Sequence, residues 1–159
     1  MKTIESRSFR YGVLTTAVLI AYFMIMKAFG LVHNFELRAF NAIIMFTGVF
    51  LSIRSYKKWK GNNFQFLKGA GVGLMTSLVV AVLFSIFVTA YVGLNPAFLT
   101  EIKQTEPQGI HLNEWAIAII IFIEAAASGF LFTYMSMQWL KSPNMSDLEE
   151  SGTDYSYSN

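Results

Sequence analysis

The sequence lacks cysteine altogether and is poor in charged residues and histidine. The absence of thiols excludes disulfides, thiolate metal sites and a cysteine nucleophile. Charged residues make up 14% of the 159 residues, whereas about 25% is usual in soluble domains. A formal net charge of only +2 gives no reason to expect a nucleic-acid partner.

Hydrophobic residues are abundant instead, and they indicate a membrane protein. They make up 54% of the chain, which includes 15 phenylalanines. A soluble domain of this size has no interior large enough to bury so many aromatic rings. Four segments are long and apolar enough to cross a bilayer as helices, which takes about 20 residues each. They cover residues 11–32, 37–53, 69–92 and 115–140.

These segments predict an all-α, polytopic fold with four transmembrane helices, in which one transmembrane domain covers residues 1–141. The first segment is too long for the apolar part of a signal peptide, which spans about 7–15 residues, so we expect it to be retained. The remaining residues, 142–159, are polar, acidic and rich in serine. We expect this tail to be disordered and cytoplasmic.

Positive charges are distributed unevenly among the connections, and this predicts the orientation. Nine Lys and Arg residues lie before the first segment, between the second and third, or after the fourth. The other two connections have only Lys103 and Arg38, the latter at the very start of the second segment. The positive-inside rule then places both termini in the cytoplasm. In the outer connection, residues 94–114, Asn95 and Pro96 predict the N-cap and first turn of a short helix.

Small residues recur at every fourth position of the third segment. Small side chains let membrane helices approach closely, and their hydroxyls can hydrogen-bond across the gap. A four-residue repeat drifts around a helix of 3.6 residues per turn, so it should touch more than one neighbour. We expect this small-residue stripe to pack the protein's own bundle, with docking of a partner subunit as the alternative. Val79 lies off the stripe, so Val79→Leu should be milder than Gly73→Leu. The stripe consists of Gly69, Gly73, Ser77, Ala81, Ser85, Thr89 and Gly93.

Two charged side chains lie well inside the predicted spans, Lys27 in the first and Glu124 in the fourth. Such residues are rare at membrane depth and usually face the interior of a bundle. Antiparallel spans would bring the two to similar depths, so we expect a buried Lys27–Glu124 ion pair. The alternatives are a neutral, hydrogen-bonded Glu124 with Lys27 reaching outward, and a proton relay.

The connection between the second and third segments combines five cations with aromatic residues in RSYKKWKGNNFQFLK, residues 54–68. This composition suits a segment that lies against anionic lipid headgroups at the cytoplasmic face. Docking of a soluble partner and simple enforcement of topology are the alternatives. The cations of this basic loop are Arg54, Lys57, Lys58, Lys60 and Lys68.

No pattern in the sequence frames a catalytic, cofactor or metal site. The glycines of KGAGVG, residues 68–73, open a membrane helix and lack the preceding strand that a dinucleotide motif needs. His33 and His111, with Glu36 or Glu114, are the one candidate metal set, but they lack the spacing of a metal motif. We expect these to be interfacial polar residues, and we expect no cofactor and no enzyme activity.

The order of these features resembles a small uncharacterised four-span family of Bacteroidetes, domain of unknown function 4199. The resemblance rests on Tyr-Gly at residues 11–12, on RSYKKWKGNNFQFLKGAGVGL running into a glycine-rich span, and on the long outer connection. It covers essentially the whole chain. It implies a bacterial inner-membrane protein and carries over no activity and no catalytic residues.

Two functions of different classes fit this sequence. The first is a non-enzymatic inner-membrane subunit that anchors, stabilises or assembles with a larger membrane complex, for example one built around a polyprenyl-phosphate glycosyltransferase. The second is a small oligomeric transporter or proton-coupled carrier that uses Lys27 and Glu124. The lack of a catalytic pattern, the long small-residue stripe and the basic loop favour the first.

Overall fold

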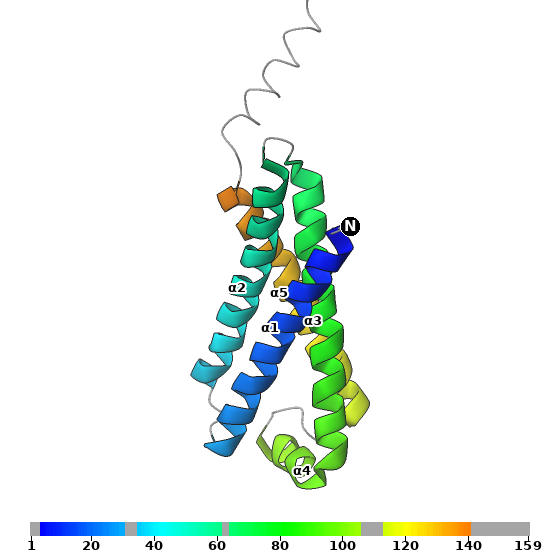
Figure 1. Ribbon diagram of the computed structural model, residues 1–159. Helices are drawn as coiled ribbons and strands as arrows, with labels where there is room; N and C mark the ends of the chain where they lie inside the picture. Colours follow the sequence, from blue (N-terminus) through cyan, green and yellow to red (C-terminus); the bar gives the residue numbers. More distant parts are fainter. Residues whose placement is uncertain (1–3, 31–34, 62–63, 106–112, 141–159) are drawn as a thin grey trace, which may run out of the picture.

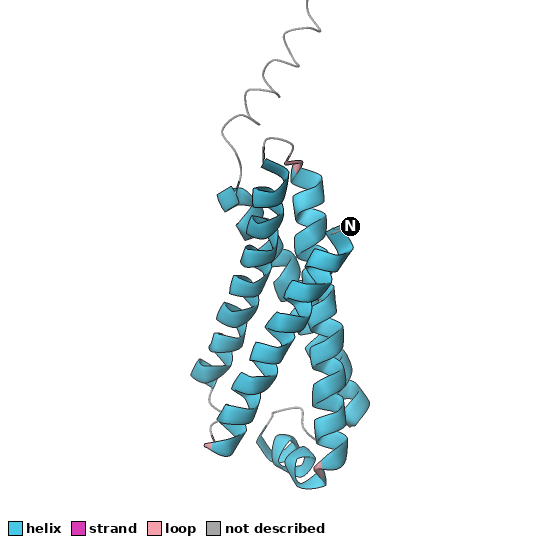
Figure 2. Ribbon diagram, viewed as in Figure 1, coloured by secondary structure: helices cyan, strands magenta, loops and turns pink. Residues whose placement is uncertain are grey.

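The computed structural model describes residues 4–30, 35–61, 64–105 and 113–140. This part of the chain consists of helices and short connections, without a strand (Figure 2). Four helices are long and apolar enough to cross a membrane, and α4 is a short one between the last two. The all-α, four-span fold predicted from the sequence is therefore confirmed. The helices are α1 (Ile4–Ala28), α2 (Phe35–Lys60), α3 (Phe66–Leu94), α4 (Pro96–Thr105) and α5 (Glu114–Leu140).

The helices α1 and α2 extend beyond the apolar segments at their polar ends. α1 starts seven residues before Tyr11, and α2 continues to Lys60. Hydropathy detects only the part of a helix that suits hydrocarbon, whereas cationic residues are good helix formers and prolong the helix into the interface. Glycines in the left-handed region follow both helices, Gly30 with φ 68° and Gly61 with φ 53°, a common way for helices to end.

The helix α3 is the centre of the bundle and packs against α1, α2 and α5. α1 also packs on α2, and α2 on α5, whereas α1 and α5 have no extensive contact. Figure 1 shows that Ile4 and Leu140, the first and last described residues, lie at the same end of the bundle, and that α4 lies at the opposite end. A chain with an even number of spans must have its two ends on the same side of the bundle.

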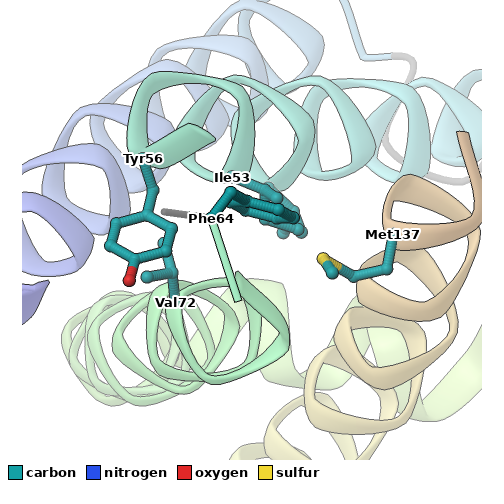
Figure 3. Packing of buried hydrophobic residues seen from close by; sticks show 6 residues of the cluster. Ile53, Tyr56, Phe64, Val72 and Met137 are labelled. Atoms are coloured by element: carbon teal, nitrogen blue, oxygen red, sulfur yellow. The ribbon is translucent and has the colours of Figure 1, made fainter. Parts of the chain in front are cut away.

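The end of the bundle near Ile4 and Leu140 is closed by a cluster that joins three helices (Figure 3). Ile53 and Tyr56 of α2 meet Val72 of α3 and Met137 of α5, and Phe64 lies in the connection between α2 and α3. All five side chains are buried. Between membrane helices such contacts stabilise by close packing, so this cluster fixes where α2 and α5 lie on α3.

The short helix that the sequence predicts after Asn95 is α4, and it lies at the opposite end of the bundle. Pro96 is its first residue, and Phe98 is buried against Val92 and Ile117. The side chain of Asn95 donates to the carbonyl of Tyr91 at 2.9 Å, so it serves the end of α3 rather than the start of α4. The predicted tail, residues 142–159, lies outside the described residues.

Candidate functional site

The small-residue stripe lies inside the chain's own bundle for most of its length. Its residues from Gly69 to Ser85 are buried, Thr89 is partly buried and Gly93 is exposed. No atom lies within 4 Å of where a Cβ atom would be at Gly93. The structure thus favours packing within the chain over docking of a partner, except at the Gly93 end.

Gly73 shows how closely the helices approach one another along the stripe. A Cβ atom at this position would lie 2.6 Å from Cγ2 of Thr133 on α5 and 2.8 Å from Cδ1 of Ile53 on α2. Both distances are shorter than real Cβ contacts, so any larger residue here would force Thr133 or Ile53 to shift. The stripe therefore contacts two neighbouring helices, as its four-residue period predicts.

Two glycines outside the stripe, to which the sequence assigned no packing role, also face α3. Gly12 of α1 faces Val79 of α3, whose Cγ1 would lie 2.6 Å from a Cβ atom at position 12, and Gly129 of α5 faces Ser77. Val79 is therefore a contact residue as well, so Val79→Leu would press on Gly12. That it is milder than Gly73→Leu stays a prediction. A lone glycine inside an apolar span is the signal that would have found these positions.

The hydroxyls of the stripe do not bridge to neighbouring helices. Ser77 donates to the carbonyl of Gly73 in its own helix at 2.9 Å, and this satisfies the hydroxyl locally. A buried polar contact of α3 that does cross between helices joins Thr76 to Ser52 of α2, whose hydroxyl oxygens lie 2.8 Å apart. A hydrogen bond between helices therefore exists, but Thr76 makes it, one residue before Ser77 of the stripe.

Lys27 lies in the last turn of α1, close to α4. Its Nζ atom is 4.2 Å from the centroid of the Phe98 ring, which is the geometry of a cation–π contact. The residue is partly buried, at the end of the bundle away from Ile4.

Glu124 lies on the outer surface of α5, and the expected Lys27–Glu124 ion pair stays a prediction that this position does not support. The residue is exposed, and α3 rather than α1 covers the inner face of its helix. With about 100° of rotation per residue, position 124 falls roughly opposite Thr133, which packs against Gly73. The side chain of Glu124 therefore lies on the side of α5 that faces away from α1 and from Lys27.

The outward face of α5 is the most extensive uncovered surface among the four spans. Only 17% of the apolar window of α5 is buried, compared with 44% for α3. Glu124 lies about 14 Å along the helix from Trp115, so it sits near mid-membrane depth on this face. The surrounding exposed residues, which together with Glu124 form what we term the α5 outer face, are Ile120, Ile123, Ala127, Leu131 and Tyr134.

The predicted basic loop is mostly helix, and its cations have separate roles. Lys57 on α2 donates to the carbonyl of Leu140 at 2.7 Å and so caps the end of α5. Lys60 lies over the ring of Trp59, with 4.4 Å from Nζ to the centroid. Lys68 is exposed on the first turn of α3. The remaining two, Arg54 and Lys58, are exposed and line a cavity between α1 and α2.

The candidate metal set cannot be placed on the structure. His33 and His111 lie outside the described residues, and the side chains of Glu36 and Glu114 are also not described. Within the described residues no three His, Asp or Glu side chains gather in a way that would hold a metal ion.

A family model matches most of the chain. Its description is "Protein of unknown function (DUF4199)", and it covers residues 10–142, so the family expected from the sequence is confirmed. No curated protein and no solved structure matches the chain.

Proposed function

We propose that this chain, which belongs to the DUF4199 family of proteins of unknown function, is a non-enzymatic subunit of a larger complex in the bacterial inner membrane. Four spans around a central α3 make a small bundle that is packed within itself on three sides of α3. Such a module suits a role in anchoring or stabilising a partner, and the α5 outer face is where the partner would bind.

The observation that carries this proposal is the outward position of Glu124. A charged side chain at the centre of a membrane helix costs about 2.5–3.5 kcal/mol on insertion scales. Within its own chain Glu124 is exposed rather than covered. A second helix laid over this face would remove the carboxyl from lipid and give it a hydrogen-bond partner.

The residues around Glu124 suit such a contact. Ala127 lies about one turn further along the same face and, being small, permits close approach of another helix. Ile120, Ile123 and Leu131 add apolar surface above and below. The partner helix should therefore present a cation or a hydrogen-bond donor at the depth of Glu124. A polyprenyl-phosphate glycosyltransferase remains a named candidate for the partner.

The carrier alternative gains no support from the geometry. Lys27 lies against Phe98 at one end of the bundle, and Glu124 faces outward from α5. A pathway that uses both residues would have to run over two helices that have no extensive contact. We therefore do not assign a transport function to this pair.

Purification in a mild detergent from native membranes tests the proposal. The wild-type chain should elute with one other membrane protein at constant stoichiometry. Glu124→Leu should lose this partner, and Glu124→Gln should retain part of it, because an amide still hydrogen-bonds.

Gln138→Leu is the matched control, since Gln138 is also polar and exposed on α5 but lies near its end. It should keep the partner. The thermal stability of Glu124→Leu alone should equal that of the wild type, because no bundle contact is removed. A monomeric wild-type chain, or equal partner recovery with Glu124→Leu and wild type, would contradict the proposal.

A further inference from the structure

A wide-open cavity of about 570 Å³, closer to a surface groove than to an enclosed pocket, lies between α1 and α2 at the end of the bundle that holds Ile4 and Leu140. Three cations line it, Arg7 from α1 and Arg54 and Lys58 from α2. The other lining residues are Tyr11, Leu51, Ser55 and Trp59. No carboxylate lines the cavity in the described part of the chain, so its charge is positive and uncompensated.

Arg7 is held in position by neutral groups. Its Nη1 atom donates to Oγ of Ser55 at 3.1 Å, and its guanidinium carbon lies 4.8 Å from the centroid of the Trp59 ring. Its Nε atom is buried and has no hydrogen-bond partner among the described residues. Because the buried Nε is closed to a ligand, a phosphate in the cavity would bind the terminal nitrogens of this guanidinium, whose fixed position suits such a contact.

The second wall of the cavity concentrates like charges. Arg54 and Lys58 lie four residues apart on α2, where their side chains are neighbours. Both are exposed, and two cations at this spacing repel each other. An anion bound between the two cations would be attracted to both and would offset their repulsion. No packing contact described in the bundle explains why these two cations lie side by side.

The cavity is polar at one end and apolar at the other. Leu51 lies seven residues before Lys58 on α2, about 10 Å deeper along the helix axis. Tyr11 lies about 6 Å deeper than Arg7 on α1. The cations and Trp59 thus lie toward the end of the bundle, and Leu51 and Tyr11 lie toward the hydrocarbon. This order matches a phospholipid, whose phosphate lies above its acyl chains.

We propose that this cavity is a binding site for the phosphate headgroup of an anionic lipid. The phosphate lies between Arg7, Arg54 and Lys58, and the start of the acyl chains lies along Leu51. Three cations bound to one phosphate favour a lipid with net negative charge over a zwitterionic one, because phosphatidylcholine brings its own cation. The site involves α1 and α2 and is separate from the α5 outer face, so it stands whether or not a partner subunit exists.

Native mass spectrometry of the full-length protein in detergent tests the site. The probes are dioleoylphosphatidylglycerol, dioleoylphosphatidylcholine and glycerol 1-phosphate, each titrated separately. The wild type should bind dioleoylphosphatidylglycerol, the glycerol lipid, at least about tenfold more tightly than dioleoylphosphatidylcholine, the choline lipid. The double variant Arg54→Gln/Lys58→Gln should lose at least about tenfold in affinity for the glycerol lipid.

The control is the double variant Arg10→Gln/Lys68→Gln. It removes two exposed cations from the same end of the bundle, and neither lines the cavity. Its lipid affinity should stay within twofold of the wild type. Equal losses in the two double variants would show non-specific attraction and overturn the site. Equal affinity for glycerol 1-phosphate and the glycerol lipid would show a soluble phosphate ligand and overturn the lipid assignment. Both substituted pairs are exposed, so thermal melting should confirm unchanged folding.

Discussion

Gly71 and Gly73 are glycines of the same helix with opposite surroundings. Gly73 is enclosed by Thr133 and Ile53, whereas no atom lies within 4 Å of where a Cβ atom would be at Gly71. Both positions look alike in the sequence KGAGVG. Only the neighbours of each residue decide which of them has to be glycine.

We expect Gly73→Ala to destabilise the bundle by about 1–3 kcal/mol, because the added methyl group overpacks the contact between α3, α5 and α2. Gly71→Ala is the matched control and should leave stability unchanged or slightly raised, since alanine favours helix over glycine. Thermal denaturation of the two variants in the same detergent measures the difference. Equal midpoints would show that α3 does not approach its neighbours at Gly73.

At the scale of helices, Lys57 connects the end of α2 to the end of α5. Its bond to the carbonyl of Leu140 satisfies one of the carbonyls that the last turn of a helix leaves unpaired. Its Nζ atom also lies 5.8 Å from the centroid of the Phe64 ring. The cation therefore acts as a clamp between two helices that are far apart in sequence.

Lys57→Met should loosen the last turn of α5, because methionine retains the length of the side chain and removes the donor. A hydrogen bond to a charged group contributes about 1.5–3 kcal/mol when buried, and this one is partly exposed. We therefore expect hydrogen–deuterium exchange in the last turn of α5 to accelerate by about threefold to tenfold. Lys68→Met, which changes an exposed lysine on α3, should leave this exchange unchanged. The same exchange rate in both variants would exclude the clamp.

At the scale of the whole molecule, four spans bring both described ends of the chain to one side. The same end holds Arg7, Arg54 and Lys58 around the cavity between α1 and α2. If the positive-inside rule applies, this is the cytoplasmic end. The lipid site would then lie in the inner leaflet, and α4 would lie outside.

We expect a tag at either terminus to be protected from external protease in intact spheroplasts. A protease site introduced at residues 103–108, after most of α4, should be cut under the same conditions. Detergent should expose both tags and serves as the control for protease activity. Digestion of the C-terminal tag in intact spheroplasts would reverse the orientation and move the proposed lipid site to the outer leaflet.

Much of the fold was predictable from composition and spacing. The spans, the short helix that starts at Pro96 and the packing role of the stripe from Gly69 to Ser85 all follow from apolar length, turn residues and small side chains. The helix ends were less predictable, because α2 continues through its cationic residues to Lys60. Arg7 was counted only as a topological charge, since nothing local indicates that it meets Ser55 of another helix.

The sequence by itself determined that four helices cross the membrane and that cations gather at one end of them. Only the tertiary structure decided which way each helix faces, and there the expectation for Glu124 differed. In a soluble helix the polar side marks the surface, but a membrane helix is apolar toward lipid as well as toward its neighbours. The rotation of α5 about its axis therefore leaves little trace in its sequence. It is set by Gly129 against Ser77 and by Thr133 against Gly73, and these contacts turn Glu124 outward.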